Sequence, residues 1–578
     1  MTPMIEAPNR NLLWARVFVD ELARGGLKTV VIAPGSRSTP LVFAFAERSD
    51  IVTHSLLDER GASFFALGLA QASDEPVAIL CTSGTAAANF LPAVVEAHYG
   101  RIPLLVLTAD RSHELRESGA NQTVDQIRLF GGHALWSVDM ALPEANPPDV
   151  LLRGLRSTAA RALAVANGTP KGAVHLNFPF RKPLEPTPEP GVRTTAPAGP
   201  DDGGPSVHVW RSRPSVDPAH CERVAQVLQQ AQRPAIVCGP RCPGGDFHGA
   251  VRALAATAGA ALFADALSGV RFGADGLSGY DTYLSAQGRP APPDAVIQLG
   301  APPTSQVLAD YLAAATGPRL LVTADGVWQD PDHLTTEWLW ADPAMLCQTA
   351  SELLKERPAT DWLEHHWRQS SKAADAFSAV RAERFFDGAA VAAVVEALPD
   401  GAQVFAASSL TVRNLDQFGR TDRQIRAMGN RGASGIDGTV SSAFGLAASD
   451  RQASTVLITG DLALYHDLNG LIAARRLGLK LITVVINNNG GGIFQRLPIA
   501  QFDPPFEALF LTPHDLTFEQ AAAQFGLTYR CVTSEMDLRA ALDGALAGEA
   551  SALVEVITDS SADLAARREV IARTGSMA

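Results

Sequence analysis

Two short polar motifs in the last third of the chain contain residue types that bind metal ions. One apolar run ends in Gly460-Asp461, and a second ends in Asn487-Asn488-Asn489-Gly490. If both runs are parallel strands of one sheet, their carboxyl ends open onto the crevice where such sheets bind ligands. A carboxylate, an amide oxygen and a glycine carbonyl then converge. One carboxylate is too few to bind Ca²⁺ alone, but the set suits Mg²⁺, which keeps waters and also binds the phosphates of a ligand. The pair of motifs therefore predicts a Mg²⁺ site with a diphosphate ligand, although either motif alone also fits a helix cap or an Asn-Gly turn.

A group of arginines indicates the charge of a further ligand. Each lies in a stretch rich in glycine and serine that we expect to form a turn beside the end of a strand, and the members are Arg37, Arg111, Arg413 and Arg431. The chain as a whole is acidic, with a formal net charge of −13. Arginine in such a turn binds carboxylates through charge-assisted hydrogen bonds, whereas a surface ion pair is the alternative for any one of them. We therefore expect ligands that carry carboxylates.

The composition excludes several classes of protein. There are 48 Lys and Arg against 61 Asp and Glu, so no basic field attracts nucleic acid or anionic lipid. No apolar run approaches the roughly 18–20 residues that span a bilayer, so we expect no membrane segment. The first residues, MTPMIEAPNR, lack a signal-peptide pattern, and a cytoplasmic protein is expected. The six cysteines lack C-x-x-C spacing and are interpreted as thiols of the core or of loops.

The elements that must position these residues follow from the hydrophobic pattern. Short aliphatic runs alternate with stretches of helical periodicity, as in parallel strands connected by helices. We predict an α/β fold with three doubly wound parallel-sheet domains, at residues 1–183, 207–356 and 375–578, joined by linkers at 184–206 and 357–374. The first linker is rich in Pro, Gly and Thr and is expected to be extended. The expected strands are 29–35, 77–84, 104–110, 233–239, 261–267, 295–301, 318–325, 404–409, 454–461, 480–489 and 552–558.

The G-D and N-N-x-G motifs, their spacing and the order of three α/β domains resemble the thiamine diphosphate enzymes. The resemblance implies thiamine diphosphate as cofactor and Mg²⁺, with Mn²⁺ as the alternative, held by Asp461, Asn488 and the carbonyl of Gly490. It also implies that Glu59, which we expect at the start of a helix, acts on the cofactor by hydrogen bonding to the aminopyrimidine. Without the resemblance, Glu59 is a residue that complements the helix dipole. The turn Thr82-Ser83-Gly84 corresponds to the loop that packs close to the cofactor.

Several longer motifs narrow the resemblance. The segments 33–41, 110–123, 408–416, 430–445, 460–471 and 487–494 are similar to the 2-succinyl-5-enolpyruvyl-6-hydroxy-3-cyclohexene-1-carboxylate synthases of menaquinone biosynthesis. That family decarboxylates 2-oxoglutarate and adds the four-carbon unit to isochorismate. The implied substrate contacts are Ser36, Arg37, Arg111, Asn121, Gln122, Ser409, Arg413 and Arg431, and the implied apolar cofactor contacts are Ile436, Ile493 and Phe494. A homo-oligomer, either a dimer or a dimer of dimers, is also implied.

One stretch departs from the family pattern. Some members have a Lys-Arg pair after a central-domain strand, whereas residues 300–307 of this chain, Gly-Ala-Pro-Pro-Thr-Ser-Gln-Val, contain no basic residue. Two alternatives stay open at this point. The chain is another thiamine diphosphate-dependent 2-oxo acid carboligase or decarboxylase, or it is a non-catalytic binding protein of the same fold. The presence of both Glu59 and Asp461 disfavours the second alternative.

Overall fold

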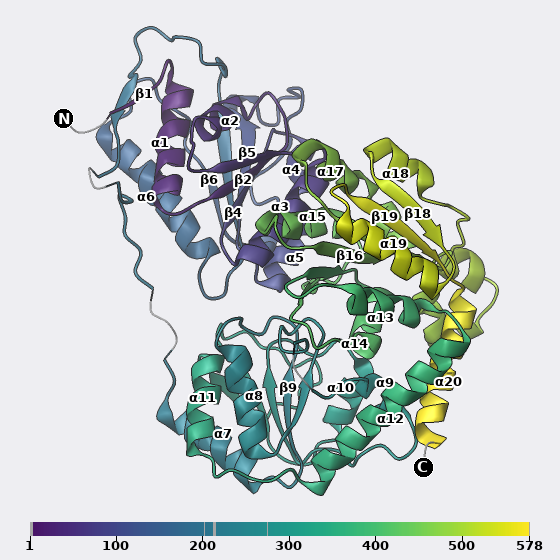
Figure 1. Ribbon diagram of the computed structural model, residues 1–578. Helices are drawn as coiled ribbons and strands as arrows, with labels where there is room; N and C mark the ends of the chain where they lie inside the picture. Colours follow the sequence, from purple (N-terminus) through teal and green to yellow (C-terminus); the bar gives the residue numbers. More distant parts are fainter. Residues whose placement is uncertain (1–3, 201–202, 212–214, 274–275, 577–578) are drawn as a thin grey trace. The chain divides into compact units, whose positions relative to one another are not determined.

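Three parallel β-sheets connected by helices make up the computed structural model, which describes residues 4–200, 203–211, 215–273 and 276–576 (Figure 1). The described chain forms two units: unit 1 is Met1–Arg211, Asn430–Arg451 and His466–Leu479, and unit 2 is Ser212–Gly429, Gln452–Tyr465 and Lys480–Ala578. The first sheet belongs to unit 1 and the other two belong to unit 2. The predicted α/β fold with three parallel sheets is therefore confirmed. None of the described helices is long and apolar enough to cross a bilayer.

The first sheet has an apolar core on each face. Its strands are β2 (Thr29–Ile32), β3 (Val52–Ser55), β4 (Val77–Cys81), β5 (Leu104–Arg111), β6 (Ala134–Asp139) and β7 (Ala173–Phe180). Its helices are α1 (Arg10–Arg24), α2 (Thr39–Ala46), α3 (Glu59–Ser73), α4 (Thr85–Asn89), α5 (Leu91–Gly100) and α6 (Asp149–Ala166). Val30 and Ile32 join the core formed with α1 and α6, so Val31 between them points to the opposite face.

Two short helices from later in the chain also belong to unit 1. They are α15 (Thr439–Ser449) and α17 (Ile472–Leu477). Helix α15 packs along α3, and Ser442 Oγ donates a hydrogen bond to the carbonyl of Phe64 over 3.1 Å. Asp467 caps the start of α15, because its carboxylate accepts from the buried backbone N–H of Ser441 at 2.7 Å. The position of α3, whose first residue is Glu59, is thus fixed along its length.

The described parts of the segment 184–206, residues 184–200 and 203–206, contact α1 and β1 instead of running free of the first domain. Its strand β8 (Thr195–Pro197) pairs antiparallel with β1 (Met4–Glu6), and Ala196 is buried in the same core as α1. Asn9 donates to the carbonyl of Glu185 at 2.8 Å, and the hydroxyl of Ser206 donates to buried Glu21 at 2.8 Å. An extended segment rich in proline cannot form a helix, but its carbonyls still accept hydrogen bonds from a neighbouring helix.

The central sheet is also covered on both faces. Its strands are β9 (Pro234–Cys238), β10 (Ala261–Ala264), β11 (Ala295–Leu299), β12 (Arg319–Thr323) and β13 (Glu337–Trp340). Its helices are α7 (Pro218–Gln230), α8 (Phe247–Ala258), α9 (Tyr280–Ser285), α10 (Gln306–Ala313) and α11 (Pro343–Leu353). Ile236 and Cys238 of β9 pack with α7, α8 and α11, whereas Ala235 and Val237 pack with α9 and α10. This alternation is the period-2 pattern of a strand buried on both sides.

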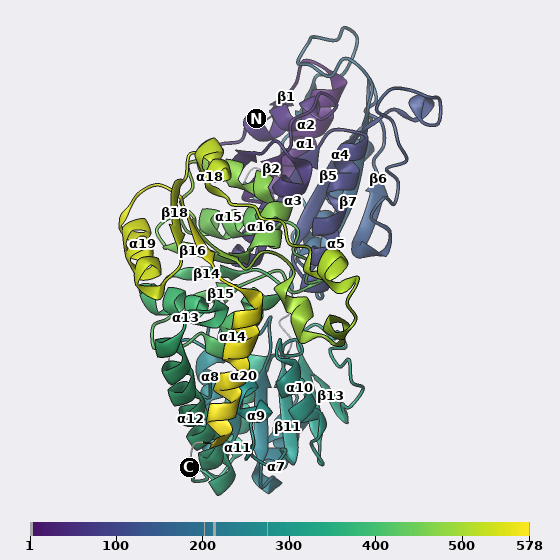
Figure 2. The same cartoon turned by 90° about the vertical axis from the view of Figure 1, so that its right-hand side faces the viewer.

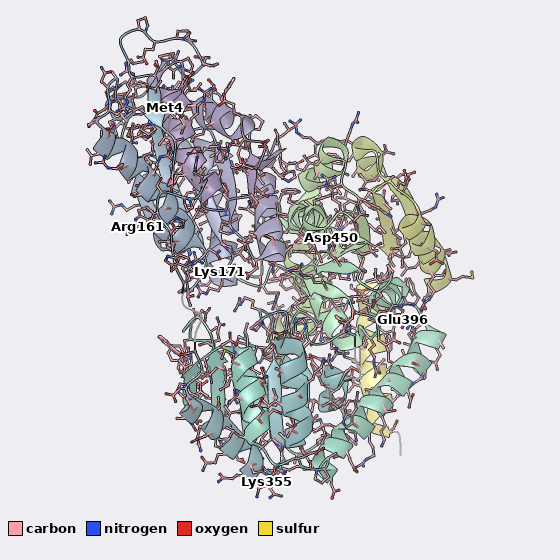
Figure 3. All side chains as sticks on the ribbon, turned by 60° about the vertical axis from the view of Figure 1, so that its left-hand side comes forward. Met4, Arg161, Lys171, Lys355, Glu396 and Asp450 are labelled. Atoms are coloured by element: carbon pink, nitrogen blue, oxygen red, sulfur yellow. The ribbon has the colours of Figure 1, made fainter. Side chains whose placement is uncertain are left out.

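The third sheet is framed by long helices. Its strands are β14 (Gln403–Ala406), β15 (Arg426–Met428), β16 (Thr455–Gly460), β17 (Ile482–Asn487), β18 (Thr528–Val532) and β19 (Ala552–Ile557). Helices of this part are α12 (Asp361–Glu383), α13 (Asp387–Ala397), α14 (Leu410–Phe418), α16 (Asp461–His466), α18 (Glu519–Phe525), α19 (Glu535–Ala547) and α20 (Ser560–Ser576). Helix α20 runs along α12 and contacts α9 (Figure 2). Glu396, labelled in Figure 3, accepts hydrogen bonds from Arg381 of α12 and Arg539 of α19. Because α12 begins at Asp361, most of the predicted linker 357–374 is helical.

All three sheets reverse their strand order at one point. The orders are β3-β2-β4-β5-β7-β6, β10-β9-β11-β12-β13 and β15-β14-β16-β17-β19-β18. In the first sheet the reversal lies between β2 and β4, and in the third it lies between β14 and β16. Connections leave these two strands toward opposite sides, so a crevice opens at their carboxyl ends. The turns after these strands are therefore the places where the fold can bind a ligand.

Helix α14, which follows β14 at the reversal, is attached to the central sheet by a buried carboxylate. Asp416 is 2% exposed, and its Oδ1 accepts from the backbone N–H of Ala266 at 2.9 Å and from Tyr280 Oη at 2.6 Å. Arg271 donates to the carbonyl of Asp416 at 3.1 Å. Burial, and secondly the charge of Asp265, raise the pKa of Asp416 to about 7. The folded chain therefore retains a proton here at pH values where an unfolded aspartate has lost it.

We expect Asp416→Asn to flatten the dependence of stability on pH between about pH 4 and 7. Because the pKa of Asp416 is raised in the folded state, protonated Asp416 stabilises the fold fully below the unfolded pKa of about 3.9. This stabilisation is lost as the pH rises toward the folded pKa, by at most about 1.4 kcal/mol per pH unit. Urea unfolding at several pH values measures this slope. Asp543→Asn, an exposed change on α19, is the control. Equal pH slopes for wild type and Asp416→Asn would contradict the prediction.

Candidate active site

The turn after β2 meets the turn after β4 at the strand reversal of the first sheet. The backbone N–H of Arg37 donates to Thr82 Oγ1 at 3.2 Å, and Arg37 Nη1 donates to the carbonyl of Phe180 at 2.9 Å. Arg37 is 8% exposed, and its Nε has no hydrogen-bond partner among the described residues. Burial, and secondly the neighbouring Arg111, lower the pKa of Arg37. A buried guanidinium with an unused N–H beside a second cation favours binding of an anionic group.

Arg111, the last residue of β5, connects the segment after that strand to the turn after β4. Its Nη1 donates to Ser83 Oγ at 3.2 Å, and its Nη2 donates to the carbonyl of Asn121 at 2.9 Å. Gln122 Nε2 donates to the carbonyl of Ser83 at 2.9 Å, and Ser83 Oγ donates back to the carbonyl of Gln122 at 3.1 Å. Gly84 has φ +88°, and a Cβ there would lie 2.8 Å from Gln122 Cγ. The structure thus brings together five predicted residues around one turn.

Glu59 lies at the amino end of α3, as predicted. The side chain of Asp58 caps the helix by accepting from the backbone N–H of Arg60 at 3.2 Å, which makes Glu59 the first helical residue. The Glu59 side chain is half-buried, and no described residue donates a hydrogen bond or forms an ion pair with its carboxylate. Burial, and secondly the charge of Glu59, raise the pKa of Cys81 at the end of β4. Glu59 is therefore a carboxylate held near a strand end and available to a ligand.

Three further predicted residues of unit 1 lie on loops. Ser36 is exposed in the turn after β2, and Arg431 and Ile436 are half-buried in the loop that precedes α15. Buried Glu96 of α5 holds this loop, since its carboxylate accepts from the backbone N–H groups of residues 432–434 at 2.5, 2.7 and 3.2 Å. The backbone beside Arg431 is therefore fixed by a carboxylate that the sequence did not single out.

Asp461 is a buried carboxylate at the strand reversal of the third sheet. It directly follows β16, begins α16 and is 2% exposed. Its carboxylate accepts from the backbone N–H of Leu462 at 2.7 Å and of Gly490 at 2.9 Å, and His514 Nε2 lies 3.2 Å from Oδ2. No Lys or Arg among the described residues forms an ion pair with it. Burial raises the pKa of Asp461. A buried carboxylate without a Lys or Arg partner is stabilised by a bound cation.

The loop after β17 places the other two predicted metal ligands beside Asp461. Asn488 Nδ2 donates to Asp387 Oδ2 at 2.9 Å, so its carbonyl oxygen is the end left to accept or coordinate. Gly490 has φ +130°, and its N–H is the group that binds Asp461. Asp387 is buried, and burial together with the charge of Asp563 raises its pKa to about 7. The amide of Asn488 is thereby oriented by a carboxyl group behind it.

These donors fit a divalent cation that is bound together with a phosphate ligand. Among the described residues no group of three or more His, Cys, Asp and Glu side chains could hold a metal. A metal at Asp461 would therefore depend on one carboxylate, the amide oxygen of Asn488 and the peptide oxygen of Gly490, and would complete its shell with water and phosphate oxygens. Mg²⁺ accepts such a shell, because it retains waters and needs few carboxylates.

The remaining predicted residues of unit 2 lie on α14 and after Gly490. Ser409 has φ +72°, an uncommon conformation for a residue other than glycine, and Arg413 Nη1 donates to its carbonyl at 2.6 Å. The expectation that Arg413 lies in a turn was wrong, because it lies in the first turns of α14. Ile493 and Phe494 are half-buried in the 3-10 turn Gly492–Arg496, and the Phe494 ring centroid lies 5.7 Å from that of Phe510.

The stretch 300–307 of the central domain contains the N-cap and the first residues of helix α10. Ser305 caps α10 by accepting from the backbone N–H of Leu308 at 3.1 Å, and its hydroxyl donates to Asp281 at 2.6 Å. Gln306 is exposed and donates to Asp310 at 2.8 Å. The loop thus supplies a helix cap and an exposed amide in the stretch where the family pattern places a basic pair.

The chain matches known proteins over nearly its whole length. Residues 14–129 match the model of the N-terminal TPP binding domain of thiamine pyrophosphate enzymes, and residues 409–556 match the model of the C-terminal TPP binding domain. It is 50% identical to the 2-succinyl-5-enolpyruvyl-6-hydroxy-3-cyclohexene-1-carboxylate synthase of Roseiflexus castenholzii, over 98% of both chains. It is 41% identical to the synthase of Haloquadratum walsbyi, again over 98% of both chains.

Solved structures show the same fold. The thiamine diphosphate-dependent 4-hydroxybenzoylformate decarboxylase of Rhodococcus jostii RHA1 superposes with a TM-score of 0.71 at 18% identity, covering 94% of this chain and 99% of that one. The benzoylformate decarboxylase of Polynucleobacter necessarius gives a TM-score of 0.71 at 18% identity, covering 95% and 99%.

Fold and site together define an enzyme of the thiamine diphosphate class, with its N-terminal and C-terminal cofactor-binding domains. Within that class, the chain belongs to the family of 2-succinyl-5-enolpyruvyl-6-hydroxy-3-cyclohexene-1-carboxylate synthases.

We expect thiamine diphosphate to bind only in the presence of a divalent metal, and Asp461→Ala to abolish that binding, because the diphosphate would lose its bridging cation. Calorimetry with Mg²⁺, with Mn²⁺ and after chelation measures both effects. Asp543→Ala on α19 is the matched control, since it removes an exposed carboxylate elsewhere in unit 2. Unchanged cofactor affinity in Asp461→Ala would remove Asp461 from the cofactor site.

Proposed function

We propose that the chain, with thiamine diphosphate and Mg²⁺ or Mn²⁺, decarboxylates 2-oxoglutarate and adds the four-carbon unit to isochorismate. The products are 2-succinyl-5-enolpyruvyl-6-hydroxy-3-cyclohexene-1-carboxylate and CO₂. The observation that carries the proposal is the 50% identity to a synthase of this name over 98% of both chains. The Arg37–Arg111 group supports it, because both proposed substrates are carboxylates and these guanidiniums lie together at a strand reversal.

The residues of this chain would divide the work as follows. Thiamine diphosphate, when bound, supplies the electron sink that decarboxylation of a 2-oxo acid requires. Glu59 exchanges a proton with the aminopyrimidine nitrogen, for which its carboxylate has no competing partner among the described residues. Asp461, Asn488 and Gly490 hold the metal. Arg37 and Arg111 bind and orient substrate carboxylates, and the burial of Arg37 strengthens that attraction by excluding water.

The experiment that tests the proposal is a turnover assay with isochorismate, 2-oxoglutarate, thiamine diphosphate and Mg²⁺. It measures CO₂ release and the mass of the product. Pyruvate and benzoylformate in place of 2-oxoglutarate test the alternative of another 2-oxo acid. Carboligation with one of these and none with 2-oxoglutarate would overturn the assignment, and cofactor binding without any turnover would favour a binding protein.

We expect Glu59→Gln to retain the fold and thiamine diphosphate affinity while turnover falls by roughly 10²- to 10⁴-fold, because an amide cannot exchange the proton as a carboxylate does. Steady-state rates and calorimetry separate the two effects. Glu549→Gln, an exposed change beyond α19, is the control. Exchange of the cofactor C2 proton at the wild-type rate in Glu59→Gln would assign the role to another carboxylate.

The same variant tests the proposed homo-oligomer. If Glu59 of one subunit and Asp461 of another build each site, a mixture of Glu59→Gln and Asp461→Ala subunits contains sites with both native residues. Dissociation and reassociation of the two inactive proteins should then restore activity. A mixture that stays inactive after verified subunit exchange would place both residues of a site on one chain.

We expect Arg37→Ala to reduce kcat/KM by roughly 30-fold to several thousand-fold, since truncating one partner of a buried charge pair costs about 2–5 kcal/mol. Arg111 is half-buried, so Arg111→Ala should reduce kcat/KM by a smaller factor. Gln306→Ala, which removes an exposed amide at the start of α10, should stay within a few-fold of wild type. Rates measured against each substrate separately test both expectations, after thiamine diphosphate binding has been verified. Damage by Gln306→Ala equal to that of the arginine variants would mean that the central loop contacts substrate.

A further inference from the structure

The irregular segment between β5 and β6 has an amide buried at its base. This segment carries Asn121 and Gln122, which contact the Ser83 turn, and it returns to the sheet at Gln126. The Gln126 side chain is 0% exposed. It lies outside the motifs that point to the site, and it has no charge of its own.

Both ends of the Gln126 amide are used. Its Oε1 accepts from the backbone N–H of Gly84 at 2.9 Å. Its Nε2 donates to the carbonyl of Ala109 at 3.2 Å and to Asn177 Oδ1 at 2.9 Å. One end must therefore accept while the other donates, which an amide does without charge and a carboxylate cannot do.

The orientation of Gln126 follows from charged groups deeper in the sheet. Asn177 Nδ2 donates to Asp110 Oδ2 and to Asp139 Oδ1, each at 2.9 Å, so its Oδ1 must be the end that faces Gln126. Thr108 Oγ1 donates to the same Oδ1 at 2.8 Å. A chain of hydrogen bonds therefore runs in one direction. The N–H of Gly84 donates to Gln126, Gln126 donates to Asn177 of β7, and Asn177 donates to the two carboxylates on β5 and β6.

We infer that Gln126 is a positioning residue that sets the Ser83-Gly84 turn and the Asn121-Gln122 segment for substrate and cofactor. Without its acceptor, the N–H of Gly84 is left buried and unpaired, and the turn that binds Arg111 through Ser83 Oγ is released. The inference deepens the proposed function, because it assigns Gln126 to the same site. It depends on contacts within unit 1 only.

Two substitutions of nearly equal size separate positioning from packing. Gln126→Met keeps the volume and removes both hydrogen-bonding ends, and we expect kcat/KM to fall about 10- to 100-fold, from the cost of an unpaired buried group. Most of this change should appear as a raised KM for the acidic substrates. The apparent affinity for thiamine diphosphate, measured by calorimetry on the apo-protein with Mg²⁺, should also weaken. Gln230→Met, an exposed change at the end of α7, is the matched control.

Gln126→Glu gives a signature that packing alone does not produce. When ionised, the introduced carboxyl group places a negative oxygen against the carbonyl of Ala109 and Asn177 Oδ1. When protonated, it restores one donor and one acceptor in the same places. The ratio of variant to wild-type activity should therefore rise as the pH falls from about 8.5 to 5.5, whereas that of Gln126→Met should stay flat.

The charged groups around Gln126 are those of the surrounding strands and the segment that follows β5. They are Asp110 of β5, Asp139 of β6, His175 of β7 and Arg116, which pairs with both aspartates. Burial lowers the pKa of His175 to about 4, so it stays neutral across this range. Dividing by the wild-type activity at each pH removes the titration that both proteins share.

The outcomes separate this inference from the proposed function. If the wild-type protein does not catalyse carboligation, the proposed function is refuted. Calorimetry of thiamine diphosphate binding to the Gln126 variants would still test the inference. An active wild type with folded Gln126 variants of normal kcat/KM and cofactor affinity would overturn the inference alone. A pH-independent loss in Gln126→Glu, or failure of both variants to fold, would reduce Gln126 to a structural role and overturn it as well.

Discussion

The reversal of strand order in each sheet is the constraint on which the rest of the molecule depends. The connections that follow the two strands at a reversal leave toward opposite faces of the sheet. A crevice therefore forms at the carboxyl ends of these strands, where a ligand can reach polar groups of the turns. In the first sheet this place holds the turns with Arg37 and Thr82, and in the third it holds Ser409 and Asp461. These four residues therefore lie where the topology leaves room for a ligand. Glu59, Arg111 and Asn488 lie at or just after the ends of the neighbouring strands β3, β5 and β17.

The central sheet has the same topology but closes its reversal with its own backbone. The N–H of Gly239 donates to the carbonyl of Leu299 at 2.9 Å, and a Cβ on Gly239 would lie 1.6 Å from the carbonyl oxygen of Ala301. The turns after β9 and β11 thus fill the space that a ligand would need. What this sheet supplies instead is an attachment for α14, through Asp416 and Tyr280, and α14 carries Arg413. The central sheet therefore contributes to the predicted site by holding α14 in position.

Within each unit, buried polar side chains hold the turns that carry the predicted site residues. Gln126 holds the Gly84 turn, Asp387 orients the amide of Asn488, and Glu96 holds the loop of Arg431. Each of them is almost fully buried. A buried hydrogen-bonding group has a strong preference for one geometry, because leaving it unpaired costs more than a typical hydrogen bond contributes. The turns can therefore remain irregular and glycine-rich while their polar groups are held in place.

The α/β class, most of the interior strands and the candidate site residues could be predicted from the sequence. Aliphatic strands buried on both faces form continuous apolar runs, and charged residues next to glycine at the ends of such runs are visible without coordinates. The expected strands at 29–35 and 454–461, for example, correspond to β2 and β16. Strands β3, β6, β13, β15 and β18 were missed; they are edge strands, which are partly exposed and lack a continuous apolar run.

Which polar residues are interior depends on contacts between segments that are distant in the sequence. Strand β7 lies inside its sheet but was missed, because His175 and Asn177 interrupt its apolar run. Their partners Thr108 and Gln126 are distant in the sequence. The segment 184–206 looked like a free linker because its composition does not reveal the carbonyls that α1 binds. Gln126 and Asp387 could not be found for the same reason. Their partners are distant in sequence, and a single buried amide or carboxyl group leaves no periodic pattern along the chain.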